Sequence, residues 1–528
     1  MHATHDVIVI GAGFAGLYML HRLRSYGYTA LILERAPSIG GTWFWNKYPG
    51  ARCDTESLQY SYQFSEELQQ EWEWTEKYAR QPEILNYLNH VADRFQLHAH
   101  IKLNFDVKNI IYKNSLWEIS GKNEEKFHAN FCIMATGCLS QPLNAKIPGI
   151  EDFEGECYQS SLWPEKKIDF TKKTIAVIGT GSSGMQLIPE VAKSAEKLYV
   201  LQRTPNYSVP AHNKSLDPDF VQEFKKNYKK NRADAKKLVS GFLTTYNKKS
   251  ALEVTKKELK EEYDRRWAAG GLAFLAAFSD ITHNLDANKT ATQYIEDKID
   301  EIVKNKKISE ALKPRSIVGC KRLVIESNYF DTFNRGNVEL INLKKNPINL
   351  IRRQGIDIEG IGEVDLDMII LATGFDAMTG ALNNIDIIGK NNIALKDKWI
   401  NGPETYLGLA TNGFPNFFTI TGPGSPSVLT NMIPTIEQHV DWIADCIRYI
   451  KKKSYHSIEA NRDAEIEWGK YNDKCARDTL RYYCDSWYLG SNVTGKKRVF
   501  YPFVGGLPVY IEKCEKIVNN SYEGFTLE

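Results

Sequence analysis

Two copies of one glycine pattern constrain the fold of this chain more than any other feature. Each copy follows an apolar, β-branched run without a gap, and the two sets are Asp6–Ile10 with Gly11, Gly13 and Gly16, and Thr174–Ile178 with Gly179, Gly181 and Gly184. In such a pattern the first glycine permits a tight turn, the second lets the backbone approach a pyrophosphate, and the third lets the following helix pack closely on the strand. The sequence therefore predicts an α/β protein with two Rossmann-like dinucleotide-binding domains.

The residues that follow the second strand differ between the two copies, and this difference bears on the ligands. In the first copy Ala30–Leu33 is followed by Glu34, whose carboxylate can accept hydrogen bonds from ribose hydroxyls. In the second copy Leu198–Leu201 leads to Arg203 and Thr204. An arginine cannot accept from a hydroxyl, but it forms charge-assisted bonds to a 2′-phosphate. We therefore expect FAD in the first fold and NADP in the second, and an ordinary surface role for Arg203 remains open.

The length and the turns of the chain indicate several domains. At 528 residues the chain is too long for one hydrophobic core. Two apolar runs end in the same Ala-Thr-Gly turn, at Gly137 and Gly374, as where a chain crosses between two nucleotide-binding folds. Residues 210–318 are rich in Lys, Glu, Ala and Leu at helical spacing, as in Leu252–Trp267, and indicate a helical insertion that either gates the substrate or is purely structural. The expected parts are an FAD-binding domain at 1–140 and 376–528, an NADP-binding domain at 141–209 and 319–375, and the insertion at 210–318.

Charge and hydropathy argue against a nucleic-acid or membrane partner. The formal net charge is only +2, and the basic run Lys225–Lys237 is interpreted as a solvated helix face. The apolar run Val7–Leu20 is interrupted by glycines and is too short to span a bilayer. No metal site is expected.

The cysteines bear on the redox compartment and on the chemistry. The chain has nine cysteines, which are scattered and include no C-x-x-C pair. This pattern favours a reducing cytoplasm over a disulfide framework. Flavoproteins with paired FAD and NADP folds include disulfide reductases and monooxygenases, and a reductase needs a dithiol soon after the first acidic residue. The thiol nearest to that position, Cys53, has no cysteine neighbour, so dithiol chemistry is disfavoured.

A segment just before the second glycine pattern carries a family resemblance. Phe153, Gly155, Gln159, Trp163 and Pro164 are spaced as in the fingerprint F-x-G-x-x-x-H-x-x-x-W-[P/D] of Baeyer–Villiger monooxygenases, with glutamine where the family has histidine. The resemblance covers nearly the whole chain and is closest to the phenylacetone monooxygenase branch. The other segments that carry it are Gly40–Trp43, Tyr48–Asp54, Gly319–Arg322, Gly422–Ser427 and Ser486–Asn492.

The resemblance implies a reaction and two catalytic residues. NADPH would reduce FAD, O₂ would add at the flavin C4a, and the resulting peroxide anion would attack a ketone to give an ester or lactone. By resemblance, Arg322 supplies the permanent positive charge beside that anion and Asp54 orients it. Two unit charges about 4 Å apart interact by roughly 4 kcal/mol at an effective dielectric constant of about 20, enough to keep such an anion deprotonated near neutral pH.

The resemblance also assigns positions around both cofactors. Lys321 would bind the 2′-phosphate with Arg203 and Thr204. A mobile loop with Trp487, Asn492 and Lys496 would fold over NADP, and an ordinary surface loop remains the alternative. Ser427, Val428 and Leu429 would shape the ketone pocket, whereas Phe153, Gly155, Gln159 and Trp163 form a linker between the domains. The remaining residues expected to contact FAD or NADP are Gly41, Thr42, Trp43, Asp54 and Met432, and Ser182 and Ser183 in the second glycine pattern.

Three functions are compatible with these residues. The leading function is an NADPH- and O₂-dependent oxidation of a small-molecule ketone by a monomer or weak homo-oligomer. A flavin-containing monooxygenase that oxygenates nitrogen or sulfur is the neighbouring alternative, although a charge pair of Arg322 and Asp54 favours a peroxide anion. The substitution at Gln159 motivates a third function, an uncoupled NADPH oxidase or a sensor.

Overall fold

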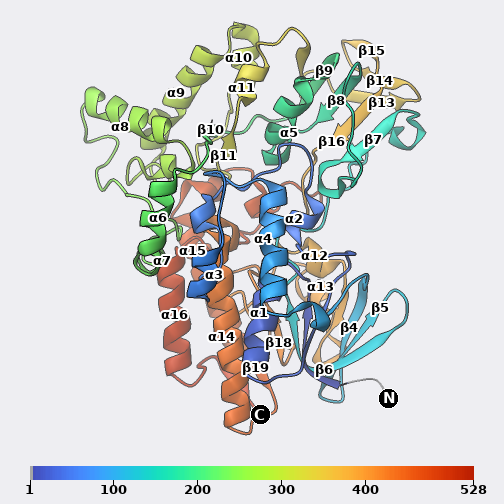
Figure 1. Ribbon diagram of the computed structural model, residues 1–528, viewed down its shortest axis with the longest axis vertical. Helices are drawn as coiled ribbons and strands as arrows, with labels where there is room; N and C mark the ends of the chain where they lie inside the picture. Colours follow the sequence, from blue (N-terminus) through green and yellow to red (C-terminus); the bar gives the residue numbers. More distant parts are fainter. Residues whose placement is uncertain (1–3) are drawn as a thin grey trace.

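The computed structural model describes residues 4–528, which form two lobes joined at a narrower waist (Figure 1). The lower lobe contains the first sheet and the long helices α14 (Met432–Lys452) and α16 (Leu507–Asn519). The upper lobe contains the second sheet and, to one side, a group of helices. The predicted α/β fold with two Rossmann-like sheets and a helical insertion is confirmed.

The first sheet is built from both parts of the chain that flank the second one. It has eight strands in the order β17-β4-β5-β6-β1-β2-β3, with β18 paired to β6. The strand β1 lies between β2 and β6, parallel to both, and Val7, Ile8 and Val9 are fully buried. The strands are β1 (Thr4–Ile10), β2 (Ala30–Leu33), β3 (Ile101–Lys102), β4 (Val107–Lys113), β5 (Leu116–Gly121), β6 (Lys126–Met134), β17 (Asp386–Ile388) and β18 (Phe417–Thr419).

The second sheet consists of five parallel strands in the order β12-β9-β8-β16-β7. Its central strands read as continuous apolar runs because helices and a small three-stranded sheet cover both faces. The strands are β7 (Glu156–Gln159), β8 (Thr174–Ile178), β9 (Lys197–Gln202), β12 (Val338–Asn342) and β16 (Met368–Leu371), and the small sheet is β13 (Ile348–Arg352), β14 (Gly355–Ile358) and β15 (Gly362–Asp365).

The helical region lies between the short parallel strands β10 (Ser208–Pro210) and β11 (Val324–Glu326). The helical pattern of Leu252–Trp267 becomes α8 (Lys256–Ala269), which starts later than the pattern because Thr255 and Glu258 form a reciprocal capping box. The other helices are α6 (Pro218–Lys226), α7 (Tyr228–Lys236), α9 (Leu285–Ile302) and α10 (Lys306–Leu312). The exact domain boundaries remain predictions.

The interpretation of Lys225–Lys237 as a solvated helix face is wrong for Lys225 and Arg232, whereas Lys226, Lys229, Lys230, Lys236 and Lys237 are exposed as expected. The run is divided between α6 and α7, and Lys225 and Arg232 are each only 8% exposed. The Lys225 ammonium donates to the Gln70 carbonyl at 2.7 Å, and the Arg232 guanidinium donates to Gln59 O at 3.0 Å and to Ser61 Oγ at 2.7 Å. These buried cations dock the helical region on the first lobe, which charge counting along a sequence does not reveal.

The expectation of unpaired cysteines is also wrong for one pair. Cys320 and Cys484 form a disulfide with a Cα–Cα distance of 6.0 Å, within the range of ordinary disulfides. The two residues are 164 positions apart, so their spacing gave no signal. The other seven cysteines are free.

The described residues contain no helix that is long and apolar enough to cross a membrane. They also contain no group of three or more His, Cys, Asp or Glu side chains that could hold a metal ion.

Candidate functional site

The first glycine pattern forms a close-packed turn between β1 and α1 (Phe14–Ser25). Gly11 has a φ of +107°, and a Cβ there would lie 2.7 Å from the Ala135 carbonyl oxygen. A Cβ on Gly16 would lie 1.9 Å from the Gly11 carbonyl oxygen, so the helix could not begin so close to the strand. Gly13 is the N-cap of α1 and leaves the free N–H groups of the first helical turn uncapped by any side chain. This turn fits a pyrophosphate.

The Glu34 carboxylate is fixed beside that turn. Its two oxygens accept hydrogen bonds from the backbone N–H groups of Ala12 at 2.7 Å and Ala36 at 2.8 Å. Burial raises the pKa of Glu34 above its ordinary value, although these bonds act in the opposite direction. Because each carboxylate oxygen can accept a further bond, Glu34 is able to accept from ribose hydroxyls, and that role stays a prediction.

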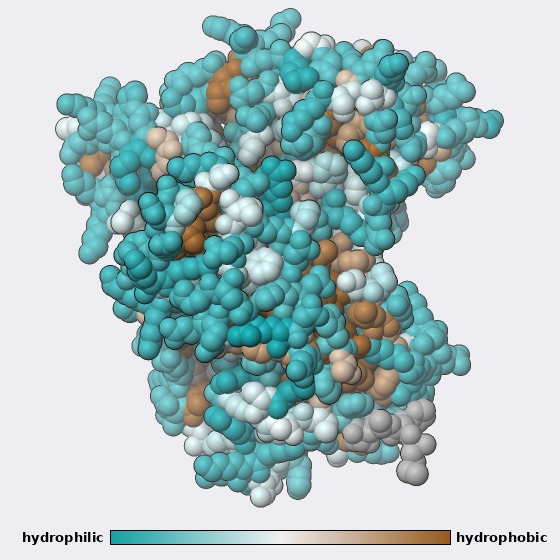
Figure 2. Space-filling model, viewed as in Figure 1, coloured by the Kyte–Doolittle hydropathy of each residue, from teal (hydrophilic) through white to brown (hydrophobic). Residues whose placement is uncertain are grey.

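A second glycine approaches the first pattern from the short helix α2 (Thr42–Trp45). Gly41 has a φ of +54°, and a Cβ on it would lie 3.0 Å from the Gly13 Cα. Trp43 is buried and donates from Nε1 to the Tyr60 hydroxyl at 3.2 Å. The backbones of Gly13 and Gly41 thus face each other where the dinucleotide is expected. On the face shown in Figure 2, hydrophobic side chains gather around the waist near α2.

The second glycine pattern repeats this geometry between β8 and α5 (Ser182–Ala192). Gly179 has a φ of +111°, and a Cβ there would lie 2.4 Å from the Ala372 carbonyl oxygen. A Cβ on Gly184 would lie 2.1 Å from the Gly179 carbonyl oxygen. Gly181 is the N-cap of α5, whose first residues are Ser182 and Ser183. The two dinucleotide folds therefore present equivalent helix N-termini.

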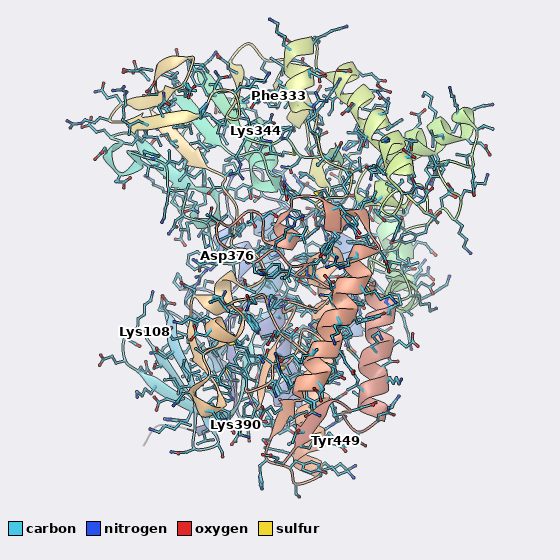
Figure 3. The ribbon with its side chains drawn as sticks, turned by 180° about the vertical axis from the view of Figure 1, so that it is seen from behind. Lys108, Phe333, Lys344, Asp376, Lys390 and Tyr449 are labelled. Carbon is cyan, nitrogen blue, oxygen red and sulfur yellow. A yellow bond between two sulfur atoms is a disulfide. The ribbon has the colours of Figure 1, made fainter. Side chains whose placement is uncertain are left out.

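Three cations, Arg203, Lys321 and Lys344, lie near one another beyond the end of β9. The Lys321 ammonium donates to Asn206 Oδ1 at 3.2 Å, and burial together with the charges of Arg203 and Lys344 lowers its pKa. In residues 4–528 no carboxylate lies within ion-pair distance of any of the three, and Figure 3 shows Lys344 in the upper lobe. Thr204 follows Arg203 directly. The Asp485 carboxylate offsets only part of this positive charge, and the remainder fits a 2′-phosphate. Lys344 is a member of this cluster that sequence reasoning missed.

The structure brings Arg322 and Asp54 together in a bidentate ion pair. Nε of Arg322 lies 2.6 Å from Asp54 Oδ2, and Nη2 lies 3.0 Å from Asp54 Oδ1. Nη1 donates to the carbonyl oxygens of Val428 at 2.9 Å and Thr430 at 3.2 Å. Burial disfavours the guanidinium charge, but the Asp54 carboxylate outweighs it and raises the pKa of Arg322. Four of the five guanidinium N–H groups are thus engaged, and one on Nη2 is left for a ligand.

The segment predicted to shape the ketone pocket contacts this arginine directly. Ser427, Val428 and Leu429 form a single 3₁₀ turn just before α14, which begins at Met432. The Ser427 side chain is fully buried, and its hydroxyl lies against the Cys138 thiol. The carbonyl groups of Val428 in this turn and of Thr430 just after it therefore hold Arg322 beside the N-terminus of α14.

Two aromatic residues that sequence reasoning did not single out also surround Arg322. The Phe242 ring centroid lies 5.6 Å from the guanidinium carbon. Tyr488 is buried, which raises the pKa of its hydroxyl, whereas the nearby charges of Arg481 and Arg322 lower it. Phe242 comes from the helical region and Tyr488 from the C-terminal part of the chain, so no local pattern indicated either one.

The segment with Trp487, Asn492 and Lys496 crosses the waist between the lobes. Trp487 opens a 3₁₀ turn, and Asn492 donates from its amide to the Phe375 carbonyl at 2.8 Å. The Lys496 ammonium contacts the Asp376 carboxylate and lies 2.6 Å from the Ala377 carbonyl oxygen. Figure 3 shows Asp376 at the waist. These bonds fasten the segment to the turn after β16.

The fingerprint residues lie where the chain passes into the second sheet. The Phe153 ring occupies the space beside Gly155, since a Cβ on that glycine would lie 2.5 Å from the ring. Gln159 ends β7 and donates from its side-chain amide to the Leu143 carbonyl at 3.1 Å. Trp163 is buried against Tyr158, with ring centroids 5.6 Å apart. Gln159 thus acts as a neutral hydrogen-bond donor to Leu143, in the segment that connects the two sheets.

The match to a known protein family defines the class to which this protein belongs. Residues 8–298, more than half of the chain, match the family described as pyridine nucleotide-disulphide oxidoreductase. Cys53, the free thiol after the first glycine pattern, is buried, which raises its pKa and keeps it protonated. The Cys320–Cys484 disulfide lies outside the matched part. The class is therefore that of the two-dinucleotide oxidoreductases, without a dithiol after the first acidic residue.

Relatives over the full length narrow this class. The chain is 39% identical to a cyclohexanone 1,2-monooxygenase from Acinetobacter sp., covering 99% of this chain and 96% of that protein. It is 36% identical to a Baeyer–Villiger monooxygenase from Pseudooceanicola batsensis, covering 98% and 96%. The solved structure of a steroid monooxygenase bound to NADP is 44% identical to this chain, with a TM-score of 0.96. That of OTEMO in complex with FAD and NADP is 36% identical, also with a TM-score of 0.96. In both comparisons the match covers 99% of this chain and 99% of the other. The chain belongs to the Baeyer–Villiger monooxygenase family, as the resemblance of its fingerprint predicts.

Proposed function

We propose that this protein is a monooxygenase that uses FAD, NADPH and O₂ to convert ketones into esters or lactones. The observation that carries the proposal is the bidentate pair of Arg322 and Asp54, held beside the Val428 carbonyl in a chain of this family. Bound FAD, once reduced by NADPH, supplies the chemistry by which O₂ is activated.

The FAD would lie along the first glycine pattern. Gly11, Gly13 and Gly16 offer the pyrophosphate the uncapped N-terminus of α1, and Glu34 offers acceptors for the ribose. Gly41, Thr42, Trp43 and Met432 would line the remainder of this site. The fit rests on the two facing glycines, Gly13 and Gly41, because a side chain on Gly41 would close the space between them.

The NADPH would lie along the second pattern, with its 2′-phosphate on Arg203, Thr204 and Lys321. The charge cluster of Arg203, Lys321 and Lys344 supports this choice over NADH, since three cations whose charge a nearby carboxylate offsets only in part favour a dianionic group. Trp487 and Asn492 would cover the other end of the nucleotide.

Arg322 would stabilise the negative charge that develops on oxygen during transfer to the ketone. A guanidinium stays charged at any physiological pH, and the Asp54 carboxylate and the carbonyls of Val428 and Thr430 fix its direction. A preorganised charge of this kind acts without reorganisation at the moment of reaction. Ser427, Val428 and Leu429 would limit the shape of the ketone.

The partners in this proposal are a small-molecule ketone and O₂. We also propose a cytoplasmic location, because the scattered cysteines suit a reducing compartment, and a monomer or weak homo-oligomer.

The test is NADPH consumption by the purified yellow protein with a panel of linear, cyclic and aromatic ketones, together with product analysis. We expect consumption to rise with suitable ketones and to yield esters or lactones. Consumption that no ketone changes, with release of hydrogen peroxide, would indicate an uncoupled oxidase. Products from amines or sulfides alone would indicate an enzyme that oxygenates nitrogen or sulfur.

A further inference from the structure

The Cys320–Cys484 disulfide joins two segments that the proposed function places at the same site. Cys320 directly precedes Lys321 and Arg322, and Cys484 lies three positions before Trp487. Cys320 is buried and Cys484 is half-buried. No step of the proposed function uses either sulfur.

Noncovalent contacts beside the disulfide hold the same two segments together. The Arg481 Nε donates to the Gly319 carbonyl at 3.1 Å, and the Arg322 backbone N–H donates to the Tyr488 hydroxyl. Two residues after Trp487–Tyr488 the chain turns away at Gly490, whose φ is +72°. The disulfide is thus the covalent member of a small contact region that fixes the start of the segment with Trp487.

The far end of that segment is fastened by hydrogen bonds and one ion pair, and between the two ends Tyr488 and Leu489 are buried in a hydrophobic cluster. Asn492 donates to the Phe375 carbonyl, and Lys496 contacts Asp376 and the Ala377 carbonyl. Residues 484–496 therefore span the waist between a covalent attachment at one end and polar contacts at the other. If the disulfide is reduced, both attachments are noncovalent and the segment has more ways to leave the surface.

We propose that Cys320 and Cys484 form a redox modification site that responds to hydroperoxide and controls how tightly NADP⁺ is held. The two thiols are oxidised to one disulfide while one hydrogen peroxide is reduced to two water molecules, so the two protons and two electrons of the thiols pass to the peroxide. Hydrogen peroxide is the product of NADPH and O₂ when no ketone is oxygenated. The inference rests on the proposed function for the placement of NADP⁺ against Trp487 and Asn492.

The disulfide itself is tested by alkylation, without any turnover. The protein, which has nine cysteines, is reduced, treated with hydrogen peroxide, denatured and alkylated, and then analysed by peptide mass spectrometry. We expect seven alkylated cysteines and one linked peptide pair that contains Cys320 and Cys484. Peroxide treatment that leaves both thiols alkylated would overturn the proposal.

The effect on the nucleotide is tested by linkage in a glutathione redox buffer. If the oxidised protein binds NADP⁺ more tightly by a given factor, saturating NADP⁺ must shift the thiol–disulfide equilibrium by the same factor. We expect oxidised protein to bind NADP⁺ about fivefold or more tightly than reduced protein. Saturating NADP⁺ should shift the thiol–disulfide equilibrium by the same factor. An equilibrium that NADP⁺ does not shift would overturn the proposal.

Matched variants assign the effect to this cysteine pair. In Cys484→Ser the affinity for NADP⁺ is expected to stay the same in oxidising and reducing buffer. Cys475→Ser, which changes a free and partly exposed cysteine nine positions earlier, is expected to keep the full redox response. A redox response that survives in Cys484→Ser would contradict the assignment. Because these measurements need no ketone, they can succeed even where every ketone fails as a substrate, and only the proposed function would then be wrong.

Discussion

Asp54 and Arg322 are 268 positions apart, yet both carboxylate oxygens accept from separate guanidinium nitrogens, at 2.6 and 3.0 Å. Asp54 comes from the lobe of the first sheet, and Arg322 lies just before β11, after the helical region. The pair therefore forms only when the two lobes are docked. Any motion that separates the lobes would also remove the fixed charge from the site.

The cation cluster predicts a strong preference for NADPH over NADH. We expect Arg203→Ala to lower that preference roughly 10- to 150-fold, because it removes a charge-assisted contact to the 2′-phosphate. Lys344→Ala should lower it by a smaller factor, since an ammonium acts as a point charge whereas the Arg203 guanidinium can bind a phosphate through two N–H groups. The measurement is the ratio of kcat/KM for the two nucleotides.

Lys345→Ala is the matched control for the cluster, because this neighbouring lysine is exposed and does not act on Lys321. It should leave the nucleotide ratio unchanged. Equal efficiency with both nucleotides in the wild type would refute the assignment of the 2′-phosphate site.

Gln159 is expected to serve as a neutral hydrogen-bonding joint. Its amide donates to the Leu143 carbonyl, a bond that a neutral histidine can also make. Gln159→His should therefore keep ketone turnover and peroxide leakage close to the wild-type values, whereas Gln159→Leu should increase leakage because it leaves the Leu143 carbonyl with one donor fewer. Ester formed per NADPH consumed measures both. The interpretation fails if Gln159→His converts a leaking oxidase into an efficient monooxygenase.

Glu437, on α14, predicts a dependence of stability on pH. Burial raises the pKa of Glu437 to about 7, although the Gln63 N–H and the charges of Lys236 and Arg232 favour ionisation. One carboxyl oxygen accepts from the Gln63 and Phe64 N–H groups, and the other is buried without a partner. Because the folded state holds this proton more tightly than the unfolded one, the stabilisation is complete below about pH 4.5 and is lost as the pH rises through about 7. The loss is roughly 3 kcal/mol.

Glu437→Gln should remove this loss, since the amide is neutral at every pH and has a similar shape. Between pH 5.5 and 8 the midpoint of thermal unfolding should fall less in the variant than in the wild type. Glu467→Gln, which changes an exposed carboxylate, should follow the wild type. Parallel curves for Glu437→Gln and wild type would show that Glu437 is ionised in the folded protein throughout this range.

Local patterns predicted the parts of the site that depend on neighbouring residues. The strand, the three glycines and Glu34 all lie within one short stretch, and steric exclusion at Gly11 and Gly16 makes that pattern specific. The charge at Arg203 was predictable because this residue also lies within a short stretch after its glycine pattern. Lys344 was missed because its proximity depends on the pairing of β12 with β9, which sets Asn342 opposite Gln202.

Contacts between distant segments could not be predicted from residue spacing. Arg322 and Asp54 came from a family resemblance, and the Cys320–Cys484 bond had no signal of any kind. The buried cations Lys225 and Arg232 were misassigned to solvent because their partners come from a distant part of the chain; these partners are backbone carbonyls, a hydroxyl and the Glu73 carboxylate. Composition gives the number of charged side chains, but it does not show which hydrogen-bond acceptors the fold places beside them.

The pairing of Arg322 with Asp54 makes the central prediction. Arg322→Ala should keep NADPH-driven reduction of the flavin, since the charge is needed only after O₂ has reacted. Ester formation should fall by about 10²- to 10³-fold or more, because a preorganised charge is lost where negative charge develops. Arg266→Ala, which removes a buried arginine in the helical region away from Asp54, controls for general damage to the fold.

The most direct measurement is a single turnover in which reduced, NADP⁺-bound enzyme is mixed with O₂ and ketone, and ester and hydrogen peroxide are counted per flavin reoxidised. The account predicts close to one ester per flavin for the wild type, and hydrogen peroxide with almost no ester for Arg322→Ala. An ester yield from Arg322→Ala equal to that of the wild type would contradict it.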